Sequence, residues 1–130
     1  EYHPYRVYFQ EETPFLTATL DGELFNVNEG TVGVYEGKTA EVSKKAQWEK
    51  WNGKVPDNYY IQLCQQLWCV GKEYTFSVLN AKLKKLNGDS ELRSYDFSRE
   101  AMEEDIAWVV SEAKKFWRYV QEDKRPPIKF

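Results

Sequence analysis

Apolar and polar residues alternate with a period of two in the first part of the chain, which predicts short β-strands. Residues 5–10 are rich in β-formers, residues 15–20 carry small or apolar side chains at every second position, and residues 31–39 form a third run. Asp21 and Gly22 form a turn signal, so we expect the second strand to end there.

The middle of the chain changes to the three- and four-residue spacing of amphipathic helices. Residues 42–52 predict a short helix with Ser43 as its candidate N-cap. Residues 57–70 predict a stronger helix that begins at Asp57 as its cap and ends before Gly71.

The last part of the chain predicts a β-hairpin followed by a long helix. Residues 73–79 and 91–97 have strand patterns, and an Asn-Gly turn at 87–88 joins them. Ser98 is placed to cap the final amphipathic helix, which a Pro-Pro pair near the C-terminus prevents from continuing.

Length and composition agree with one globular domain over residues 1–130. A chain of 15.4 kDa with 42% hydrophobic and 30% charged residues can bury one core. No apolar run approaches the ~20 residues of a membrane span. The predicted order βββ-α-α-ββ-α describes an α/β (α+β) domain with a short central sheet flanked by helices.

The composition excludes most histidine-based chemistry. The one histidine, His3, lies near the N-terminus, which argues against Ser-His-Asp and Cys-His hydrolases and against His-rich metal sites. Cys64 and Cys69 lie on different faces of the predicted helix, unsuited to a disulfide framework or a zinc site. We therefore expect a reducing, cytoplasmic setting, and any catalysis must use carboxylates and lysine.

The charge is unevenly distributed along the chain. The net charge of −3 argues against a simple basic nucleic-acid-coating protein. Residues 1–36 carry one Arg against seven acids (−6), residues 37–54 five Lys against two Glu (+3), and residues 114–130 six bases against two acids (+4). Metal-dependent enzymes that act on phosphates often place an acidic pocket beside basic strips. The alternative is that these blocks are solvated faces.

Two carboxylates and a lysine are predicted to gather at one edge of the sheet. Glu36 and Lys38 share one face of the third predicted strand. Asp21 comes beside Glu36 if the preceding strand pairs with this one as a hairpin. Neighbouring carboxylates bind Mg²⁺ or Mn²⁺, and an adjacent lysine orients water or offsets charge on a phosphate. The alternative is an ordinary surface ion pair between Glu36 and Lys38.

The arrangement Asp21-x14-Glu36-x-Lys38 resembles the D-x(n)-E-x-K signature of the PD-(D/E)XK nuclease superfamily. The surrounding segments resemble the YqaJ-like viral recombinase family, which includes lambda-type exonucleases, and the likeness extends over residues 7–127. Three segments carry it: PFLTATLDG at residues 14–22, YEGKTA at residues 35–40, and the P-x-x-Y-x-x-Q helix with its terminal glycine at residues 55–71.

The resemblance implies a restriction-endonuclease-like core and an Mg²⁺- or Mn²⁺-dependent DNA exonuclease that hydrolyses phosphodiester bonds. It implies that Asp21 and Glu36 ligate the metal together with the carbonyl of Gly37, and that Lys38 positions or activates the attacking water. Gln62 matches a glutamine on the helix that approaches the active site and the DNA strand end.

Further residues are candidates for contacts with DNA. Tyr59 precedes Gln62 on the same predicted helix, with a place in the core as its alternative. Lys44 and Lys45 are placed to contact phosphates beside two tryptophans, at positions 48 and 51, that either stack on bases or pack their helix onto the domain.

The chain also departs from the family pattern. Cys64 stands where the family often has a second glutamine, and the family's upstream acidic helix has no counterpart, so we expect a nuclease-like domain missing its N-terminal helical part. The alternatives are a non-catalytic DNA- or protein-binding module with the nuclease fold, or an unrelated α+β interaction domain. The resemblance implies linear duplex DNA ends, a single-strand annealing protein and further copies of the chain as partners, in the cytoplasm of a phage host.

Overall fold

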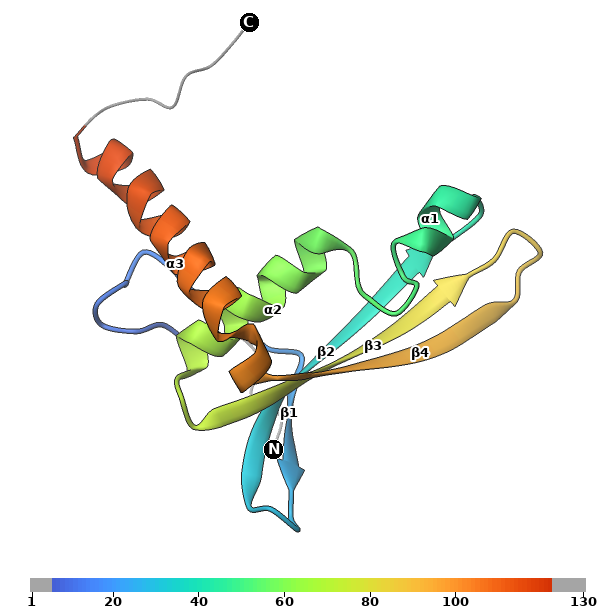
Figure 1. Cartoon of the computed structure of the whole chain (residues 1–130), viewed down its shortest axis with the longest axis horizontal. Coiled ribbons are helices and arrows are strands. Elements are labelled where there is room, and N and C mark those ends of the chain that lie inside the picture. Colours follow the sequence, from blue (N-terminus) through green and yellow to red (C-terminus); the bar gives the residue numbers. More distant parts are fainter. Residues whose placement is uncertain (1–5, 123–130) are drawn as a thin grey trace, which may run out of the picture.

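A four-stranded mixed sheet with two long helices against one face forms the domain (Figure 1). The computed structural model describes residues 6–122 of the chain. The strands lie side by side in chain order: β1 (Gly22–Asn26), β2 (Thr31–Glu41), β3 (Tyr74–Lys84) and β4 (Ser90–Ser98). The predicted class, a mixed sheet flanked by helices, is therefore confirmed.

The strand pairing explains how distant segments meet. β1 and β2 form an antiparallel hairpin, and so do β3 and β4. The central pair, β2 and β3, is parallel, which requires a long crossover connection, and the helices α1 (Lys45–Glu49) and α2 (Asp57–Val70) lie in it. The predicted hairpin around Asn87 and Gly88 is confirmed, with Gly88 at a φ of 90° that favours glycine.

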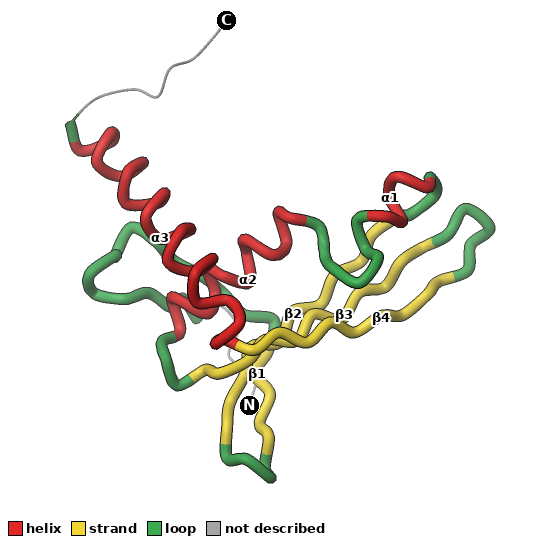
Figure 2. Tube along the Cα trace, viewed as in Figure 1, coloured by secondary structure: helices red, strands yellow, loops and turns green. Residues whose placement is uncertain are grey.

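The two strands predicted at residues 5–10 and 15–20 are wrong for the residues that the structure describes. Those residues form loops that touch only through an isolated bridge between Tyr8 and Ala18 (Figure 2). Asp21 and Gly22 do not make a turn either, because β1 begins there and its turn follows Asn26.

The physical reason is that the N-terminal segment runs along α2 and bonds to it. Side chains of α2 donate hydrogen bonds to backbone carbonyl oxygens that would otherwise pair with a neighbouring strand. Polar side chains of the segment also form hydrogen bonds with α2. Five contacts make this link: Gln65 Nε2 to Thr17 O (2.5 Å), Gln66 Nε2 to Thr19 O (3.2 Å), Trp68 Nε1 to Thr13 Oγ1 (2.9 Å), Cys69 Sγ to Leu16 O (3.4 Å) and Gln10 Nε2 to Cys69 O (3.1 Å).

The three predicted helices are present, and the first two have other N-cap residues than the sequence predicts. α1 is shorter than the predicted range 42–52, and Ser43 is not its N-cap, because its backbone N–H and hydroxyl both donate to Gln47 Oε1. α2 matches its prediction, although Asp57 is its first helical residue and Pro56 holds the cap position. The last helix, α3 (Arg99–Gln121), is capped as predicted, since Ser98 Oγ accepts the N–H of Ala101 at 3.2 Å.

The core lies between the sheet and the two long helices. Side chains from β2 and β3 pack against α2 and the first half of α3, and its largest fully buried members include Leu63, Leu67, Leu79, Leu83 and Met102. The predicted apolar stripe of α3 is buried only as far as Val110, and Phe116 and Val120 are exposed. The helix is longer than the body it covers, so its C-terminal half extends past the sheet (Figure 1).

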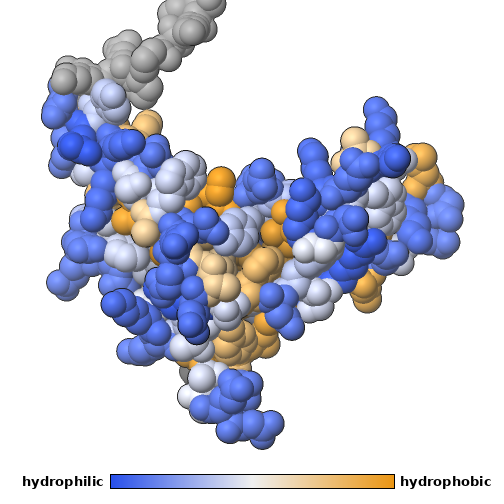
Figure 3. Space-filling view, in the orientation of Figure 1, coloured by the Kyte–Doolittle hydropathy of each residue, from blue (hydrophilic) through white to orange (hydrophobic). Residues whose placement is uncertain are grey.

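The outer surface has hydrophilic areas at two ends of the molecule and an apolar area between them (Figure 3). Hydrophilic side chains cover both the projecting part of α3 and the far end of the β3–β4 hairpin, with apolar side chains between them (Figure 3). Among residues 6–122, no helix has the length and apolar character needed to cross a bilayer.

The tryptophans beside α1 differ in their surroundings. Trp51 is buried, with its ring 5.7 Å from Tyr59 and 5.9 Å from Tyr95, so it packs the helix onto the domain. Trp48 is half-buried, and the guanidinium of Arg93 lies 5.3 Å from its ring. The packing alternative is thus correct for Trp51, and this ring is not available to stack on a base.

Both cysteines are buried free thiols, and we expect neither to react with DTNB at pH 8 in the folded protein. Burial raises the pKa of the Cys64 and Cys69 thiols to about 11, and the reactive species is the thiolate. Both should react after denaturation. In the unfolded chain a thiol has a pKa of about 8.5, below its pKa in the folded protein. The free energy of unfolding should therefore fall as the pH rises from about 8.5 to about 11. Rapid reaction of either thiol in the native state would contradict the burial.

Candidate active site

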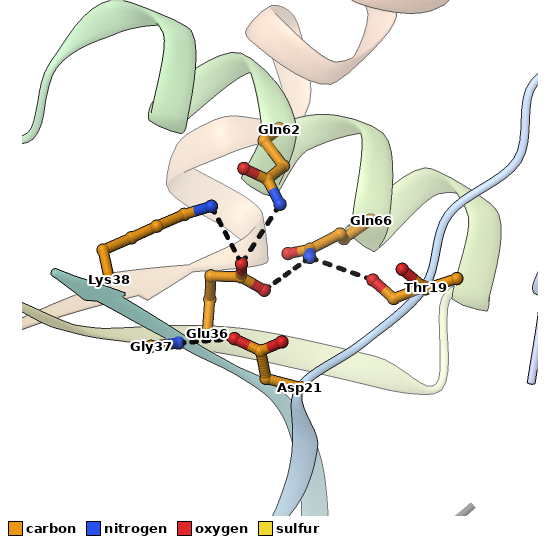
Figure 4. Close-up of polar contacts among 7 residues, drawn as sticks. All are labelled: Thr19, Asp21, Glu36, Gly37, Lys38, Gln62 and Gln66. Atoms are coloured by element: carbon orange, nitrogen blue, oxygen red, sulfur yellow. Dashed lines mark hydrogen bonds and ion pairs between the residues drawn. The ribbon is translucent and has the colours of Figure 1, made fainter. Parts of the chain in front are cut away.

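The residues singled out in the sequence meet where β1 and β2 pair. Gly22 of β1 lies opposite Tyr35 of β2, so Asp21 comes next to the Glu36–Gly37 peptide. Asp21 Oδ2 accepts the backbone N–H of Gly37 at 2.9 Å (Figure 4). The β1–β2 pairing thus brings Asp21 beside Glu36, although the strand that the sequence predicts for this pairing, at residues 15–20, does not form and β1 follows Asp21 instead.

Glu36 is the centre of the cluster and is only 4% exposed. Its Oε1 accepts from Gln62 Nε2 and pairs with Lys38 Nζ, both at 3.1 Å, and its Oε2 accepts from Gln66 Nε2 at 2.8 Å (Figure 4). A buried carboxylate is costly without such donors. The interpretation of Glu36 and Lys38 as an ordinary surface ion pair is therefore wrong.

Lys38 is held in place from two sides. Besides its ion pair with Glu36, its ammonium lies 5.0 Å from the centre of the Tyr59 ring. A cation over an aromatic face is attracted by the ring quadrupole. Tyr59 also packs on Trp51, so it belongs both to the core and to the surroundings of Lys38.

Gln66 belongs to the cluster and is missed by the sequence analysis. It is 1% exposed, and its Nε2 donates both to Glu36 and to the carbonyl oxygen of Thr19. The available signal is its spacing: Gln62 and Gln66 are four residues apart, so they lie on one face of α2 one turn apart.

Lys44 and Lys45 are not brought to this cluster. Both are exposed at the start of α1, beyond the end of β2 (Figure 1). The structure thus separates them from Asp21, Glu36 and Lys38, and a contact with DNA there stays a prediction.

A groove with a volume of about 330 Å³ lies beside the cluster. Its lining is neutral and rich in hydroxyl and amide groups, and it includes Thr17, Thr19, Asn58, Ile61, Gln62 and Gln66. Because Gln62 and Gln66 also bond to Glu36, the groove opens directly next to the buried carboxylate.

The donor chemistry fits a hard divalent cation. Mg²⁺ prefers oxygen ligands, keeps several waters and often binds proteins through one or two carboxylates. Asp21 and Glu36 supply these, and the buried Oε1 of Gln66, which has no hydrogen-bond partner, is a further oxygen in the same cluster. Within residues 6–122, no group of three or more His, Cys, Asp or Glu side chains is arranged to hold a metal ion. A site here therefore relies on two carboxylates.

Comparison with known proteins identifies the family of the chain. Residues 2–73, more than half of the chain, match the family model described as YqaJ-like viral recombinase domain. No curated protein and no solved structure matches the chain significantly. The matched stretch contains Asp21, Glu36, Lys38, Gln62 and Gln66. The chain therefore belongs to the YqaJ-like viral recombinase family, a phage-type recombination family whose members are generally divalent-metal-dependent nucleases.

Proposed function

We propose that this protein is a metal-dependent exonuclease that hydrolyses phosphodiester bonds at the ends of linear duplex DNA. The observation that carries the proposal is the meeting of Asp21, Glu36 and Lys38 at one place in the fold. The resemblance assigns catalysis to these residue types, and the match to the family model supports that resemblance.

In this proposal Asp21 and Glu36, with the carbonyl of Gly37, hold Mg²⁺ or Mn²⁺. When bound, the ion would supply Lewis-acid chemistry and lower the pKa of a water molecule that it holds. Lys38 then has the role of offsetting negative charge on the phosphate or orienting the water, because its ammonium is fixed beside Glu36. Gln62 donates to the same Glu36 oxygen as Lys38 and would keep that carboxylate turned toward the groove.

DNA would reach the site along the neutral groove. Amide and hydroxyl groups can bond to sugars and base edges without a net charge, while Lys38 provides the cation nearest to Glu36. Tyr59, half-buried with its ring under the Lys38 ammonium, would contact DNA beside that lysine. Lys44 and Lys45 would contact the DNA backbone further away.

Linear, 5′-phosphorylated duplex DNA should be degraded in Mg²⁺ or Mn²⁺ and left intact in EDTA. Asp21→Asn should abolish the degradation and keep the fold, because the asparagine oxygen can still accept the Gly37 N–H while the negative charge is lost. Gel analysis of end-labelled DNA measures the first result, and circular dichroism checks the second.

The matched control is Asp96→Asn, an exposed aspartate of β4 on the side of the sheet away from the helices. It should degrade DNA like the unchanged protein. Degradation in EDTA, or full activity of Asp21→Asn, would contradict the proposal.

A non-catalytic DNA-binding module is the second candidate. Its support is that both oxygens of Glu36 already have nitrogen donors, an arrangement that also suits a purely structural carboxylate. Such a module would bind DNA equally well in EDTA and in Mg²⁺ and would degrade it in neither. Fluorescence anisotropy with labelled DNA separates the two candidates.

The finer assignments also remain proposals. A recombination nuclease of this family would work with a single-strand annealing protein, could assemble with further copies of itself, and would act in the cytoplasm of the phage host. We likewise propose that the chain forms a single nuclease-like domain.

A further inference from the structure

We propose that Gln66 is a positioning residue, which anchors one oxygen of Glu36 so that the other is presented to the metal ion. This inference rests on the proposed function. It concerns a side chain of α2 that the D-x(n)-E-x-K signature does not include.

The contacts divide the Glu36 carboxylate into two halves. Oε2 accepts from Gln66, which is 1% exposed, at 2.8 Å. Oε1 meets Gln62 and Lys38, both only partly buried and at the longer distance of 3.1 Å. Oε2 is therefore the enclosed oxygen, whereas Oε1 lies on the more accessible side of the carboxylate, with partners that are only partly buried.

Gln66 also links Glu36 to the segment of backbone that leads to Asp21. The same Nε2 donates to Thr19 O at 3.2 Å, two residues before Asp21. Both hydrogens of one amide group are thus used, one on β2 and one on the segment that leads into β1. The spacing of the two carboxylates depends on this bridge.

Packing alone does not explain a glutamine here. The buried Oε1 of Gln66 has no partner, which costs free energy that an apolar side chain of the same volume would avoid. Turning the amide over would place its oxygen against the Glu36 carboxylate and the Thr19 carbonyl, both of which can only accept. The residue is held in the one orientation that donates to Glu36, and its own oxygen remains an acceptor for a water molecule inside the cluster.

The test uses Gln66→Met, which keeps the length and volume of the side chain and removes its donors. Titration calorimetry without DNA gives the dissociation constant for Mn²⁺, and steady-state kinetics on linear duplex DNA give kcat and KM. We expect Mn²⁺ binding to weaken about tenfold or more, the scale seen when residues that orient metal ligands are removed. We expect kcat to fall with little change in KM, since both amide hydrogens of Gln66 are already used inside the protein, on Glu36 and on Thr19, and are not available to DNA.

Gln10→Met is the matched control. Gln10 makes a comparable link between the N-terminal segment and α2, from its Nε2 to Cys69 O, without touching Glu36. Its Mn²⁺ affinity should equal that of the unchanged protein. Thermal unfolding in EDTA reports whether each variant folds; if Gln66→Met does not, Gln66→Asn, whose amide is one methylene shorter, should show the same loss of affinity.

The outcomes separate this inference from the function beneath it. Wild-type affinity for Mn²⁺ in a folded Gln66 variant would overturn the role of Gln66 and leave the nuclease proposal standing. A similar loss of Mn²⁺ affinity in Gln10→Met would also overturn it. The loss would then follow from breaking any link between the N-terminal segment and α2, and not from the contact of Gln66 with Glu36. Absence of both Mn²⁺ binding and DNA degradation in the unchanged protein would overturn the proposed function and this inference together.

Discussion

Lys38→Ala is expected to slow metal-dependent DNA degradation by about 10²–10³-fold, the usual scale for removing a group that stabilises charge in a transition state. The Lys38 ammonium pairs with Glu36 at 3.1 Å, and it also lies over the Tyr59 ring. Removing it takes away the lysine's share of the positive charge that offsets a phosphate at this site and leaves that task to the bound metal ion. Degradation of end-labelled duplex DNA at saturating Mg²⁺ measures the loss.

The fold should survive this change. Glu36 keeps its hydrogen bonds from Gln62 and Gln66, so the cost in unfolding free energy should be about 1–2 kcal/mol, between that of exposed and buried ion pairs. Circular dichroism and urea unfolding check this expectation.

Lys82→Ala provides the control for Lys38→Ala. Lys82 lies on the neighbouring strand β3, opposite Thr39, with its side chain exposed. Its loss should leave the rate nearly unchanged. Full activity of Lys38→Ala, or equal losses in the two variants, would show that Lys38 has no special part in the reaction.

Arg99→Met is expected to lower the free energy of unfolding by about 3–5 kcal/mol, as for other breaks in buried charged networks. Arg99 is 7% exposed, and its Nη1 donates to three backbone carbonyls: Leu67 O (2.6 Å), Gly71 O (2.9 Å) and Tyr74 O (3.3 Å). These oxygens belong to the end of α2, the turn after it and the start of β3. One side chain therefore joins three elements to the first residue of α3.

The loss is large because methionine fills the space but leaves buried carbonyl oxygens without donors. Urea unfolding followed by circular dichroism measures the change. Arg118→Met, an exposed arginine on the same helix, is the control and should change the unfolding free energy by no more than about 0.5 kcal/mol. A loss below about 1 kcal/mol for Arg99→Met would contradict the structural role of the buried guanidinium.

The elements predicted well are those with strong local signals. The helix at residues 57–70 combines regular apolar spacing with a proline before it and a glycine after it, and its bounds are as predicted. The hairpin of β3 and β4 follows from its Asn-Gly turn, and α3 begins at its Ser98 cap. Each of these signals acts within a few residues, so no knowledge of the rest of the fold is needed.

The N-terminal segment shows the limit of local patterns. Residues 15–20 alternate like a strand, but alternation specifies only which side chains can face a core, not which partner receives the backbone hydrogen bonds. The side-chain amides of Gln65 and Gln66 in α2 donate hydrogen bonds to the carbonyl oxygens of Thr17 and Thr19. The partners in these bonds are about fifty residues apart in the sequence. Tertiary structure therefore overrides the local preference.

The sequence alone determined the order of most elements and the family, and it singled out Asp21, Glu36 and Lys38 as one group, because strand periodicity and motif spacing are local properties. Only the tertiary structure decided that Glu36 is buried, that Gln66 shares it with Gln62 and Lys38, and that Lys44 and Lys45 lie apart from it. These facts depend on how α2 lies across the sheet. The angle and depth of that packing arise from the whole core, and no short stretch of sequence contains them.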